Sequence, residues 1–429
     1  MRAILLVTAA LTAPPAAARD APDPVRLRAS VEKLVGFGTR HTLSSPTDPS
    51  RGIGAARRWT AGEFAAIGKA CGGCLKVESV ERVFTGSRAP DGVNIVDVLG
   101  VQPGSEPGRV VIVQAHIDSR VTDVMNATSD APGANDDASG VALVLEAARI
   151  LSREKFRATI VYAALSGEEQ GLFGGQLLAE TAKARGWTVS AVLNNDIVGN
   201  TLGQGGERVT DRVRVFSEGI RASEDLPQQI ARRAAGGEDD GPSRALAKTI
   251  DGIADGIANS LDVFLDRRPD RFGRGGDHEP FLKLGYPAVR FSEGAENYDA
   301  QHQDLRTEGS RLYGDTLERM DFSYLAKVTA INVATIARLA AAPAAPDRVV
   351  LSGALSTDTT VKWTPVPGAA RYRIHIRRND AADWSRTLDV DGRASSTVVK
   401  GVIVDDSFVG VSSVAADGAE SIVTFGGRS

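Results

Sequence analysis

The stretch RVVIVQAHIDS, Arg109–Ser119, is an apolar run that ends in a histidine and an aspartate. Such a run is typical of a strand that is buried on both faces of a sheet. Its neighbours alternate between two patterns: Asn94–Gly100, Arg157–Leu165 and Val189–Val198 resemble strands, and Gly140–Ser152 and Leu172–Arg185 resemble helices. This alternation predicts an α/β fold, with a mostly parallel mixed sheet and helices on both faces.

The character of the chain changes near residue 339. Residues 339–348, LAAAPAAPDR, are rich in Ala and Pro and predict a linker. After it, short strand-like segments follow one another, separated by Gly, Pro and Asp, with no helical pattern between them. Residues 349–429 are therefore predicted to form a small all-β sandwich. They resemble a fibronectin type III domain, with Trp363 and Tyr372 as buried aromatic residues on successive strands.

The first eighteen residues, MRAILLVTAALTAPPAAA, contain Arg2, a short apolar run and a small-residue end. This pattern predicts a signal peptide that is cleaved after Ala18, a disordered start being the alternative. No later segment has about 18 uninterrupted apolar residues, so we expect no transmembrane segment after cleavage. We expect export to the periplasm or the extracellular space.

A net charge of -4 gives neither the basic surface that nucleic acids require nor a polybasic membrane patch. We therefore expect a peptide or small-molecule partner and no nucleic acid. Cys71 and Cys74, in CGGC, are the only cysteines. They follow a helix-like segment and precede a strand-like one, the reverse of a redox motif, and a zinc ribbon needs a second pair. In an exported chain this pair favours a local disulfide, with free thiols as the alternative.

Histidines and carboxylates follow several of the predicted strands. These residues are His116, Glu168, Glu169, Asp196 and, after the strand-like YPAVRFS, His302. In open α/β sheets, ligands bind at the carboxyl ends of the strands, so these side chains are expected to converge. Buried carboxylates need a compensating cation, and a set of His, Asp and Glu without thiolate suits zinc or a similar divalent ion.

The loop PGANDDASG, Pro132–Gly140, places two adjacent acids before a predicted helix. Helix capping alone is one explanation of these acids. However, five candidate ligands exceed the three that a catalytic zinc usually takes from a protein, which favours two ions. Two ions about 3.5 to 4 Å apart need a bridging carboxylate on a tight loop, and Asp136 is predicted to be that bridge.

In order along the chain, AHIDS, PGANDDASG, SGEEQG, NND and YDAQHQ resemble the motifs of the secreted dizinc aminopeptidases of metallopeptidase family twenty-eight. The similarity spans about residues 30 to 340, and the expected catalytic domain covers residues 19–338. The resemblance implies a zinc exopeptidase fold, two Zn²⁺ per chain and peptide substrates with a free N-terminus.

The resemblance also implies individual roles. The implied zinc ligands are His116 and Asp196 for one ion, Glu169 and His302 for the other, and Asp136 between the two ions. Glu168 matches the general base, which takes a proton from the attacking water and passes it to the leaving amine. Asp118 matches the carboxylate that orients His116.

Two alternatives remain open at this point. A glutaminyl cyclase shares the fold but uses a single zinc, and a non-catalytic binding ectodomain keeps the fold without its ligands. The metal content of the purified chain separates these hypotheses. A contact of the C-terminal domain with a surface or a carbohydrate is a further hypothesis.

Several other polar residues are assigned no catalytic role. His278 is expected to support the pocket or contact substrate, His41 to lie in an N-terminal loop, and Arg274 to form a surface salt bridge. His375 alternates with apolar residues on a strand and is expected to point outward with no function. Residues 237–241, GEDDG, are expected to form a solvated acidic loop.

Overall fold

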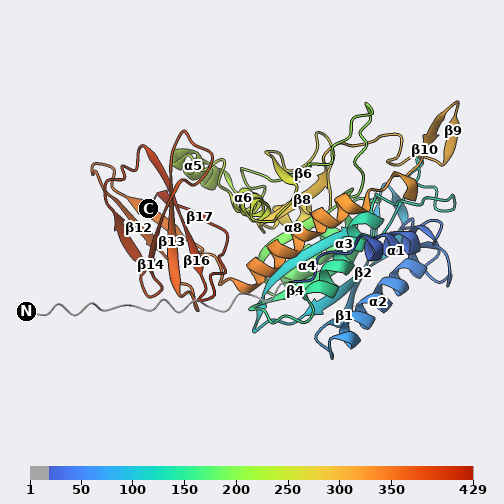
Figure 1. The fold of residues 1–429 in the computed structure, drawn as a ribbon, viewed down its shortest axis with the longest axis horizontal. Helices are drawn as coiled ribbons and strands as arrows, with labels where there is room; N and C mark the ends of the chain where they lie inside the picture. Colours follow the sequence, from blue (N-terminus) through green and yellow to red (C-terminus); the bar gives the residue numbers. More distant parts are fainter. Residues whose placement is uncertain (1–18, 429) are drawn as a thin grey trace, which may run out of the picture.

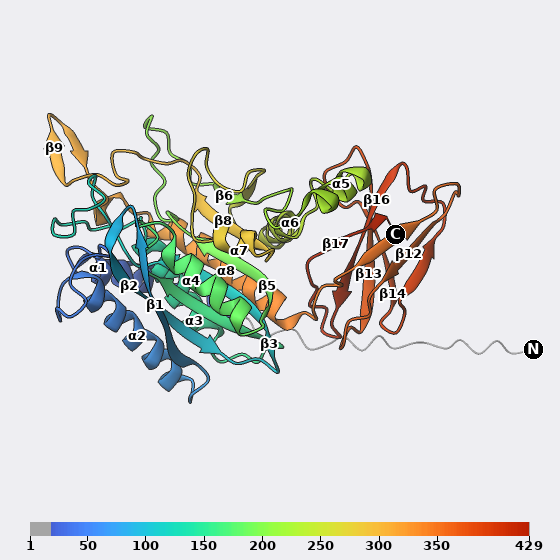
Figure 2. The same ribbon diagram turned by 180° about the vertical axis from the view of Figure 1, so that it is seen from behind.

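The computed structural model describes residues 19–428, so the predicted signal peptide, residues 1–18, lies outside the described residues. The described chain forms two parts along the long axis of the molecule, an α/β part and a smaller β part (Figures 1 and 2). Over residues 19–428, no helix combines the length and the apolar character that crossing a membrane requires.

An eight-stranded sheet forms the centre of the α/β part, with the strand order β1-β2-β4-β3-β5-β8-β6-β7. Its strands are β1 (Lys76–Gly86), β2 (Ala89–Gln102), β3 (Glu106–His116), β4 (Ala158–Leu165), β5 (Thr188–Asn195), β6 (Arg212–Phe216), β7 (Asp262–Asp266) and β8 (Ala288–Glu293). The neighbours β4-β3-β5-β8 and β6-β7 are parallel, and the remaining pairs are antiparallel. This mixed, mostly parallel sheet confirms the predicted fold class.

Helices cover both faces of the sheet. They are α1 (Pro24–Val35), α2 (Gly52–Ala70), α3 (Ala138–Leu151), α4 (Phe173–Ala184), α6 (Pro242–Asp255), α7 (Glu279–Lys283) and α8 (Phe322–Ala341). Helix α5 (Leu226–Ala235) lies beside the C-terminal part instead (Figure 1). Between β8 and α8 lie a small hairpin, β9 (Arg306–Glu308) with β10 (Arg311–Tyr313), and the 3-10 helix η1 (Leu317–Arg319).

The central strand β3 shows why the sheet needs cover on both sides. Val111 and Val113 belong to the core under α1, α2, α3 and α8, whereas Val110 and Ile112 belong to a second core under α4 and α7. Successive side chains of a strand point to opposite faces, so a continuous apolar run requires two apolar layers. The sheet is therefore enclosed, and only the ends of its strands are available for a site.

The predicted linker is shorter than expected. Helix α8 continues to Ala341, so the first three residues of the segment 339–348 are helical. Alanine is the best helix former, and Ala342, which precedes Pro343, has an extended ψ of 157°. A proline disfavours the helical conformation in the residue before it, which ends the helix at this point.

The C-terminal part consists of two four-stranded sheets with a hydrophobic core of their own. The strands are β11 (Val349–Ser352), β12 (Thr359–Trp363), β13 (Arg371–Arg378), β14 (Arg386–Asp391), β15 (Ser396–Val399), β16 (Ser407–Val414), β17 (Thr424–Phe425) and β18 (Gly427–Arg428). Trp363 and Tyr372 are buried in this core with ring centroids 5.1 Å apart. The likeness to a fibronectin type III domain stays a prediction.

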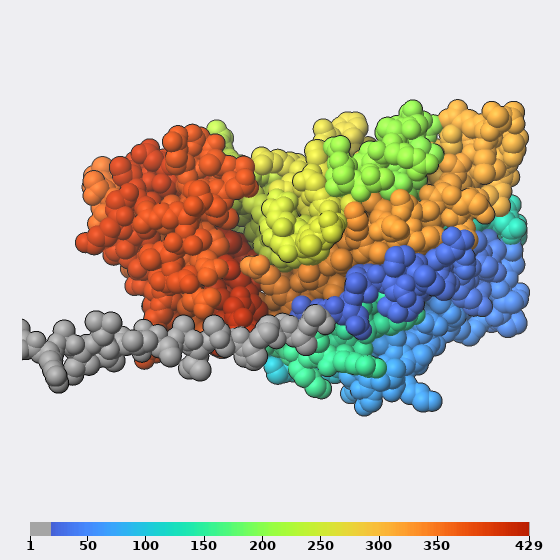
Figure 3. All heavy atoms as spheres, in the orientation of Figure 1, coloured from blue at the N-terminus to red at the C-terminus, as the bar shows by residue number. Residues whose placement is uncertain are grey.

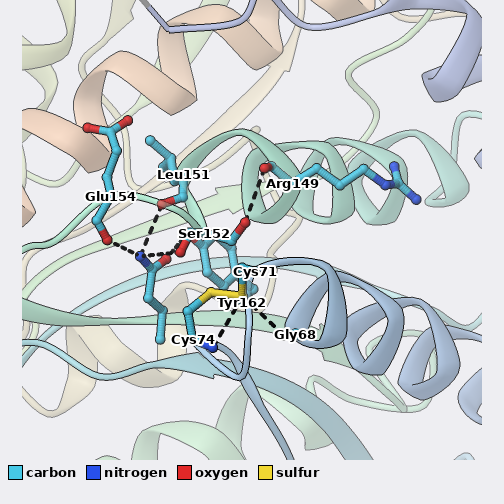
Figure 4. The surroundings of a disulfide bond; sticks show 9 residues. Gly68, Cys71, Cys74, Arg149, Leu151, Ser152, Glu154 and Tyr162 are labelled. Atoms are coloured by element: carbon cyan, nitrogen blue, oxygen red, sulfur yellow. Dashed lines mark hydrogen bonds between the residues drawn. A yellow bond between two sulfur atoms is a disulfide. The ribbon is translucent and has the colours of Figure 1, made fainter. Parts of the chain in front are cut away.

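Cys71 and Cys74 form a disulfide at the C-terminal end of α2 (Figure 4), as expected. The sulfur of Cys71 lies 3.2 Å from the carbonyl oxygen of Gly68. Gly72 and Gly73, between the two cysteines, have φ values of 75° and 90°, which glycine adopts without steric cost. The CGGC motif therefore forms a tight turn between α2 and β1.

The C-terminal part packs against the α/β part (Figure 3). Charged side chains pair across this contact. Arg377 of β13 pairs with Asp240, which precedes α6, and Glu420 lies 3.3 Å from Arg338 of α8. His375 Nε2 lies 3.0 Å from the same Glu420 carboxylate.

Two expectations were wrong at this contact. His375 does point away from the sandwich core, but it is only 8% exposed, because Trp384, Ser412 and Glu420 contact it and residues of α6 and α8 line the same pocket. The segment 237–241 is not a solvated loop: Asp240 is buried against Arg377, and Asp239 pairs with Arg244 and Lys248. Alternation in the sequence predicts which side of a strand a residue faces, but not which other elements cover that side.

Candidate metal centre

The predicted ligands converge at the carboxyl ends of the strands. His116 is the last residue of β3, Glu168 and Glu169 lie in the loop after β4, and Asp196 directly follows β5. His302 lies in the segment between β8 and β9. Parallel strands deliver their C-terminal residues to the same edge of the sheet, which brings residues far apart in sequence together.

Two groups of side chains there have the spacing of metal ligands. One consists of His116, Asp136 and Asp196, and the other of Asp136, Glu169 and His302. Within each group the candidate ligand atoms all lie within 4.8 Å of one another. Asp136 belongs to both, with Oδ1 3.1 Å from His116 Nε2 and Oδ2 3.0 Å from His302 Nε2.

The two acids of the loop have different surroundings. Asp137 is the N-cap of α3: its Oδ1 accepts from the backbone N–H of Gly140 at 3.0 Å, and its Oδ2 accepts from that of His116 at 3.1 Å. Asp136 has no such capping contact and faces the two histidines. Capping therefore explains Asp137, whereas Asp136 is available as a metal ligand.

Asp315, which the sequence did not single out, fixes the backbone of this loop. Its carboxylate accepts from the backbone N–H groups of Asn135, at 2.9 Å, and Asp136, at 2.7 Å. Buried Arg40 donates to the carbonyl oxygens of Pro132 and Gly133 at 2.6 and 2.9 Å. The loop is thus held from both sides, which sets the position of the Asp136 side chain.

Asp118 connects His116 to the loop that carries the two glutamates. His116 Nδ1 lies 3.1 Å from the carbonyl oxygen of Asp118 and 3.6 Å from its carboxylate, so the carbonyl is the closer acceptor. This contact leaves His116 Nε2 to face Asp136. The Asp118 carboxylate accepts from the backbone N–H groups of Gly167 at 3.0 Å and Glu169 at 3.2 Å.

Two arginines contact the candidate ligands and were not predicted. Arg120 Nε lies 2.7 Å from Glu169 Oε2, and its Nη2 lies 2.6 Å from His302 Nδ1. Buried Arg290 of β8 places Nη1 2.7 Å from Asp196 Oδ2. An arginine within an otherwise apolar strand needs a carboxylate partner, and this is the signal that identifies Arg290 in the sequence.

The electrostatics of the site favour a cation between the carboxylates. Burial lowers the pKa of His302, but Glu169 and Asp136 outweigh burial and raise it to about 10. Burial likewise opposes protonation of His116, yet Asp118 and Asp136 raise its pKa well above its usual range. Burial raises the pKa of Glu168 well above its usual range, opposed by His116 and reinforced by Glu169.

These groups open into a cavity of about 610 Å³. Its lining includes the five candidate ligands and Glu168. The side chain of Glu168 forms no hydrogen bond or ion pair within residues 19–428, so its carboxylate is free to act on a molecule in the cavity.

The remaining expectations concern residues around the site. Arg274 pairs with Glu296 at 2.6 Å, as expected, and also lines the cavity. His278 is buried with Nε2 2.7 Å from the carbonyl oxygen of Pro269, a supporting contact. His41 is buried with Nε2 2.9 Å from the carbonyl oxygen of Val124 and does not line the cavity.

The donor set fits two zinc-like ions. Imidazole nitrogens and carboxylate oxygens, without thiolate, are ligands that suit zinc in catalytic sites. Glu169 Oε1 is buried and lies 3.0 Å from His302 Nε2, but that contact lacks hydrogen-bond geometry and the oxygen has no hydrogen-bond partner in the described chain. A buried carboxylate oxygen without a donor is accounted for by a metal ion bound there.

Comparison with known proteins agrees with this geometry. Residues 97–321 match peptidase family M28. A relative from Leptosphaeria maculans, described as a probable zinc metalloprotease, is 43% identical over 400 residues, which cover 92% of each chain. A probable zinc metalloprotease from Pyricularia oryzae is 43% identical over 415 residues, 94% of this chain and 82% of its own.

Solved structures show the same fold. LapB from Legionella pneumophila superposes with a TM-score of 0.55 at 18% identity, covering 73% of this chain and 71% of its own. A leucine aminopeptidase precursor from Bacteroides thetaiotaomicron has a TM-score of 0.53 at 19% identity, covering 74% and 98%. The family match covers more than half of the chain, and the relatives align along nearly all of it. The protein therefore belongs to peptidase family M28.

Proposed function

We propose that this protein is a zinc-dependent aminopeptidase that removes the N-terminal residue from peptides at a centre of two metal ions. The observation that carries the proposal is that two groups of ligand-type side chains share Asp136. A shared carboxylate is the usual bridge of a two-metal hydrolase. The relatives' description as probable zinc metalloproteases and the aminopeptidase fold of LapA and other solved structures support it.

His116, Asp136 and Asp196 would hold one ion, and Asp136, Glu169 and His302 the other. When bound, the two ions supply Lewis-acid polarisation of the scissile carbonyl and a lowered pKa for the attacking water.

Glu168 would act as the general base, because its carboxylate lines the cavity without a hydrogen-bond or ion-pair partner in the described chain and burial raises its pKa above the usual range. It would take a proton from the water and return it to the leaving amine. Asp118 would keep His116 and the glutamate loop in place through its carbonyl oxygen and carboxylate. The substrate's ammonium group would pair with carboxylates of the cavity lining, which makes a free N-terminus a requirement.

Three measurements test this function. The metal content of the purified chain should be about two zinc ions, against one for a glutaminyl cyclase and none for a binding module. Aminoacyl chromogenic substrates should be hydrolysed, and a chelator should abolish the hydrolysis until zinc is restored. Acetylation of the substrate's amine should also abolish it. Efficient internal cleavage of a blocked peptide would instead point to an endopeptidase.

We further propose that residues 1–18 direct export and that the segment from 349 onward is a separate domain with fibronectin type III character. The composition of the first eighteen residues supports export. The separate core around Trp363 and Tyr372 supports the domain. Detection of the mature N-terminus at Arg19 in the exported fraction of cells would test the first of these proposals.

A further inference from the structure

Arg88 lines the metal cavity and has no role in the mechanism proposed above. It is exposed in the turn between β1 and β2, and its Nη1 donates to the carbonyl oxygen of Glu169 at 2.7 Å. No carboxylate of residues 19–428 lies within ion-pair distance of its guanidinium group. Most of its donors, and its charge, therefore face the cavity mouth without a protein partner.

Arg274 is the second such residue. It lies in the segment between β7 and α7, where its Nη1 is 2.6 Å from Glu296 Oε2. Its Nε and Nη2 make no hydrogen bond within the described part of the chain. Glu296 also pairs with Arg214 at 2.7 Å, whereas Arg271 is closer to Asp270, at 2.9 Å, than to Glu296, at 3.5 Å. Arg274 therefore shares its carboxylate partner with Arg214 and is only partly neutralised.

The two arginines connect to different ligand groups of the metal centre. Arg88 holds the backbone of Glu169, which belongs to the group with His302. The residue after Arg274, Gly275, accepts from Arg290 Nη1 at 3.0 Å, and the same Nη1 is 2.7 Å from Asp196 of the other group. A substrate that lies across the centre would therefore extend toward one arginine or the other.

The charge of the cavity points to the kind of group that these arginines meet. Five carboxylates and four arginines line it, and two of the carboxylates already pair with arginine: Glu169 with Arg120 and Asp196 with Arg290. Two divalent ions would neutralise the carboxylates of the two ligand groups, which leaves Arg88, and in part Arg274, as uncompensated positive charge in the lining. Such a cavity favours a substrate that brings negative charge beyond the reacting bond.

We propose that Arg88 and Arg274 bind a carboxylate of the peptide substrate and make this site selective for carboxylate-bearing substrates. The proposal rests on the aminopeptidase function proposed above. Arginine matches a carboxylate with paired N–H donors, and hydrogen bonds between charged groups are the stronger ones in proteins. The carboxylate comes either from an acidic side chain at the N-terminal residue or from the C-terminus of a short peptide.

Two substrate pairs distinguish these sources. Glutamyl and glutaminyl p-nitroanilide differ only in the side-chain charge, and Leu-Gly and Leu-glycinamide differ only in the C-terminal charge. For each pair, the ratio of kcat/KM for the charged over the uncharged member is measured in the wild type, Arg88→Gln and Arg274→Gln. Arg268→Gln is the matched control, because Arg268 is exposed in the same segment as Arg274 but does not line the cavity.

The ratio of at least one pair should exceed one in the wild type and fall about ten- to a hundredfold in Arg88→Gln or Arg274→Gln, while Arg268→Gln keeps the wild-type ratio. The affected pair identifies the source of the carboxylate. Calorimetry measures the affinity of the zinc-loaded chain for glutamate and for glutamine. The ratio of these two affinities should fall in the same variant as the ratio of kcat/KM. If the wild type prefers glutamate to glutamine, the two variants lose this preference and no protein hydrolyses a substrate, the inference about the arginines holds and only the proposed function is contradicted. Unchanged ratios and unchanged glutamate binding in both variants would overturn the inference.

Discussion

Glu168 and Glu169 are adjacent in the chain, yet only the carboxylate of Glu169 has charged partners. Glu169 Oε2 lies 2.7 Å from Arg120 Nε, and its Oε1 lies 3.0 Å from His302 Nε2. The carboxylate of Glu168 forms neither a hydrogen bond nor an ion pair within residues 19–428. One residue of the pair is thus fixed as a ligand would be, and the other is available for proton transfer.

Glu168→Gln should lower kcat on an aminoacyl substrate by about 10² to 10⁴, the usual scale for the loss of a general base. The amide keeps the shape of the side chain but cannot accept the water's proton. Zinc content, measured by atomic emission, should stay near two per chain. The dependence of kcat on pH should show the ionisation of Glu168 in the wild type, and this ionisation should be absent from the profile of the variant.

Glu169→Gln should instead weaken one metal site, because a neutral amide is a poorer zinc ligand than a carboxylate. Its zinc content should fall toward one per chain under dialysis that leaves the wild type loaded. Loss of zinc in Glu168→Gln with retention in Glu169→Gln would show that the two roles are exchanged.

Asp315→Ala should lower zinc affinity by about 10- to 100-fold, the scale seen when a group behind a metal ligand is removed. The substitution leaves the backbone N–H groups of Asn135 and Asp136 without their acceptor. Competition with a chromophoric chelator measures the affinity. Asp91→Ala is the matched control, since the side chain of Asp91 is exposed and makes no hydrogen bond or ion pair within the described chain. Equal affinities for both variants would refute a positioning role for Asp315.

The sequence was sufficient to predict those parts of the centre that depend on local pattern. The apolar run of β3 required a buried strand, and a strand buried in an α/β sheet places His116 at the ligand-binding edge. The order of short motifs allowed the family to be identified, which the comparisons confirm.

Contacts between distant segments could not be predicted in this way. Asp315 lies 179 residues from Asp136, and Arg120 lies 182 residues from His302. No local periodicity encodes such pairs. The same limit explains the error at His375: period-two alternation correctly placed it on the outer face of the sandwich, but Trp384, Ser412 and Glu420, which contact it, lie on other segments of the chain.

Glu420 should contribute to stability in a pH-dependent way. Burial opposes its ionisation, but hydrogen bonds from His375 and Ser412 and the charge of Arg373 outweigh burial and lower its pKa to about 2. A folded-state pKa below the unfolded value of about 4.3 stabilises the protein above that pH, and this contribution is lost as the pH falls toward 2.

Thermal unfolding of wild type and Glu420→Gln at pH 7 and pH 3 checks this expectation. The variant should melt at a lower temperature at pH 7, and the difference should narrow at pH 3. A difference that is the same at both pH values would show that the charge of Glu420 does not act at this contact.

Truncation after Ala342 should leave the turnover of a small aminoacyl substrate within a few-fold, because every residue of the two metal groups precedes the linker. The melting temperature should fall, since Asp240 loses Arg377 and keeps only Lys248, 3.2 Å away, as an ion-pair partner, while the surface under the sandwich becomes exposed to water. Complete inactivity of a soluble, zinc-loaded truncated chain would contradict a separate catalytic domain.

The paired charges between the two parts have a consequence for modular engineering. Arg377 is matched to Asp240, and Glu420 to Arg338, across a surface where Arg377, Asp240 and Glu420 are largely shielded from water. A chimera that carries a foreign sandwich would bring neither Arg377 nor Glu420 to this surface. The junction residues alone would not make such a graft compatible, and the foreign sandwich would need its own counterparts of Arg377 and Glu420 opposite Asp240 and Arg338.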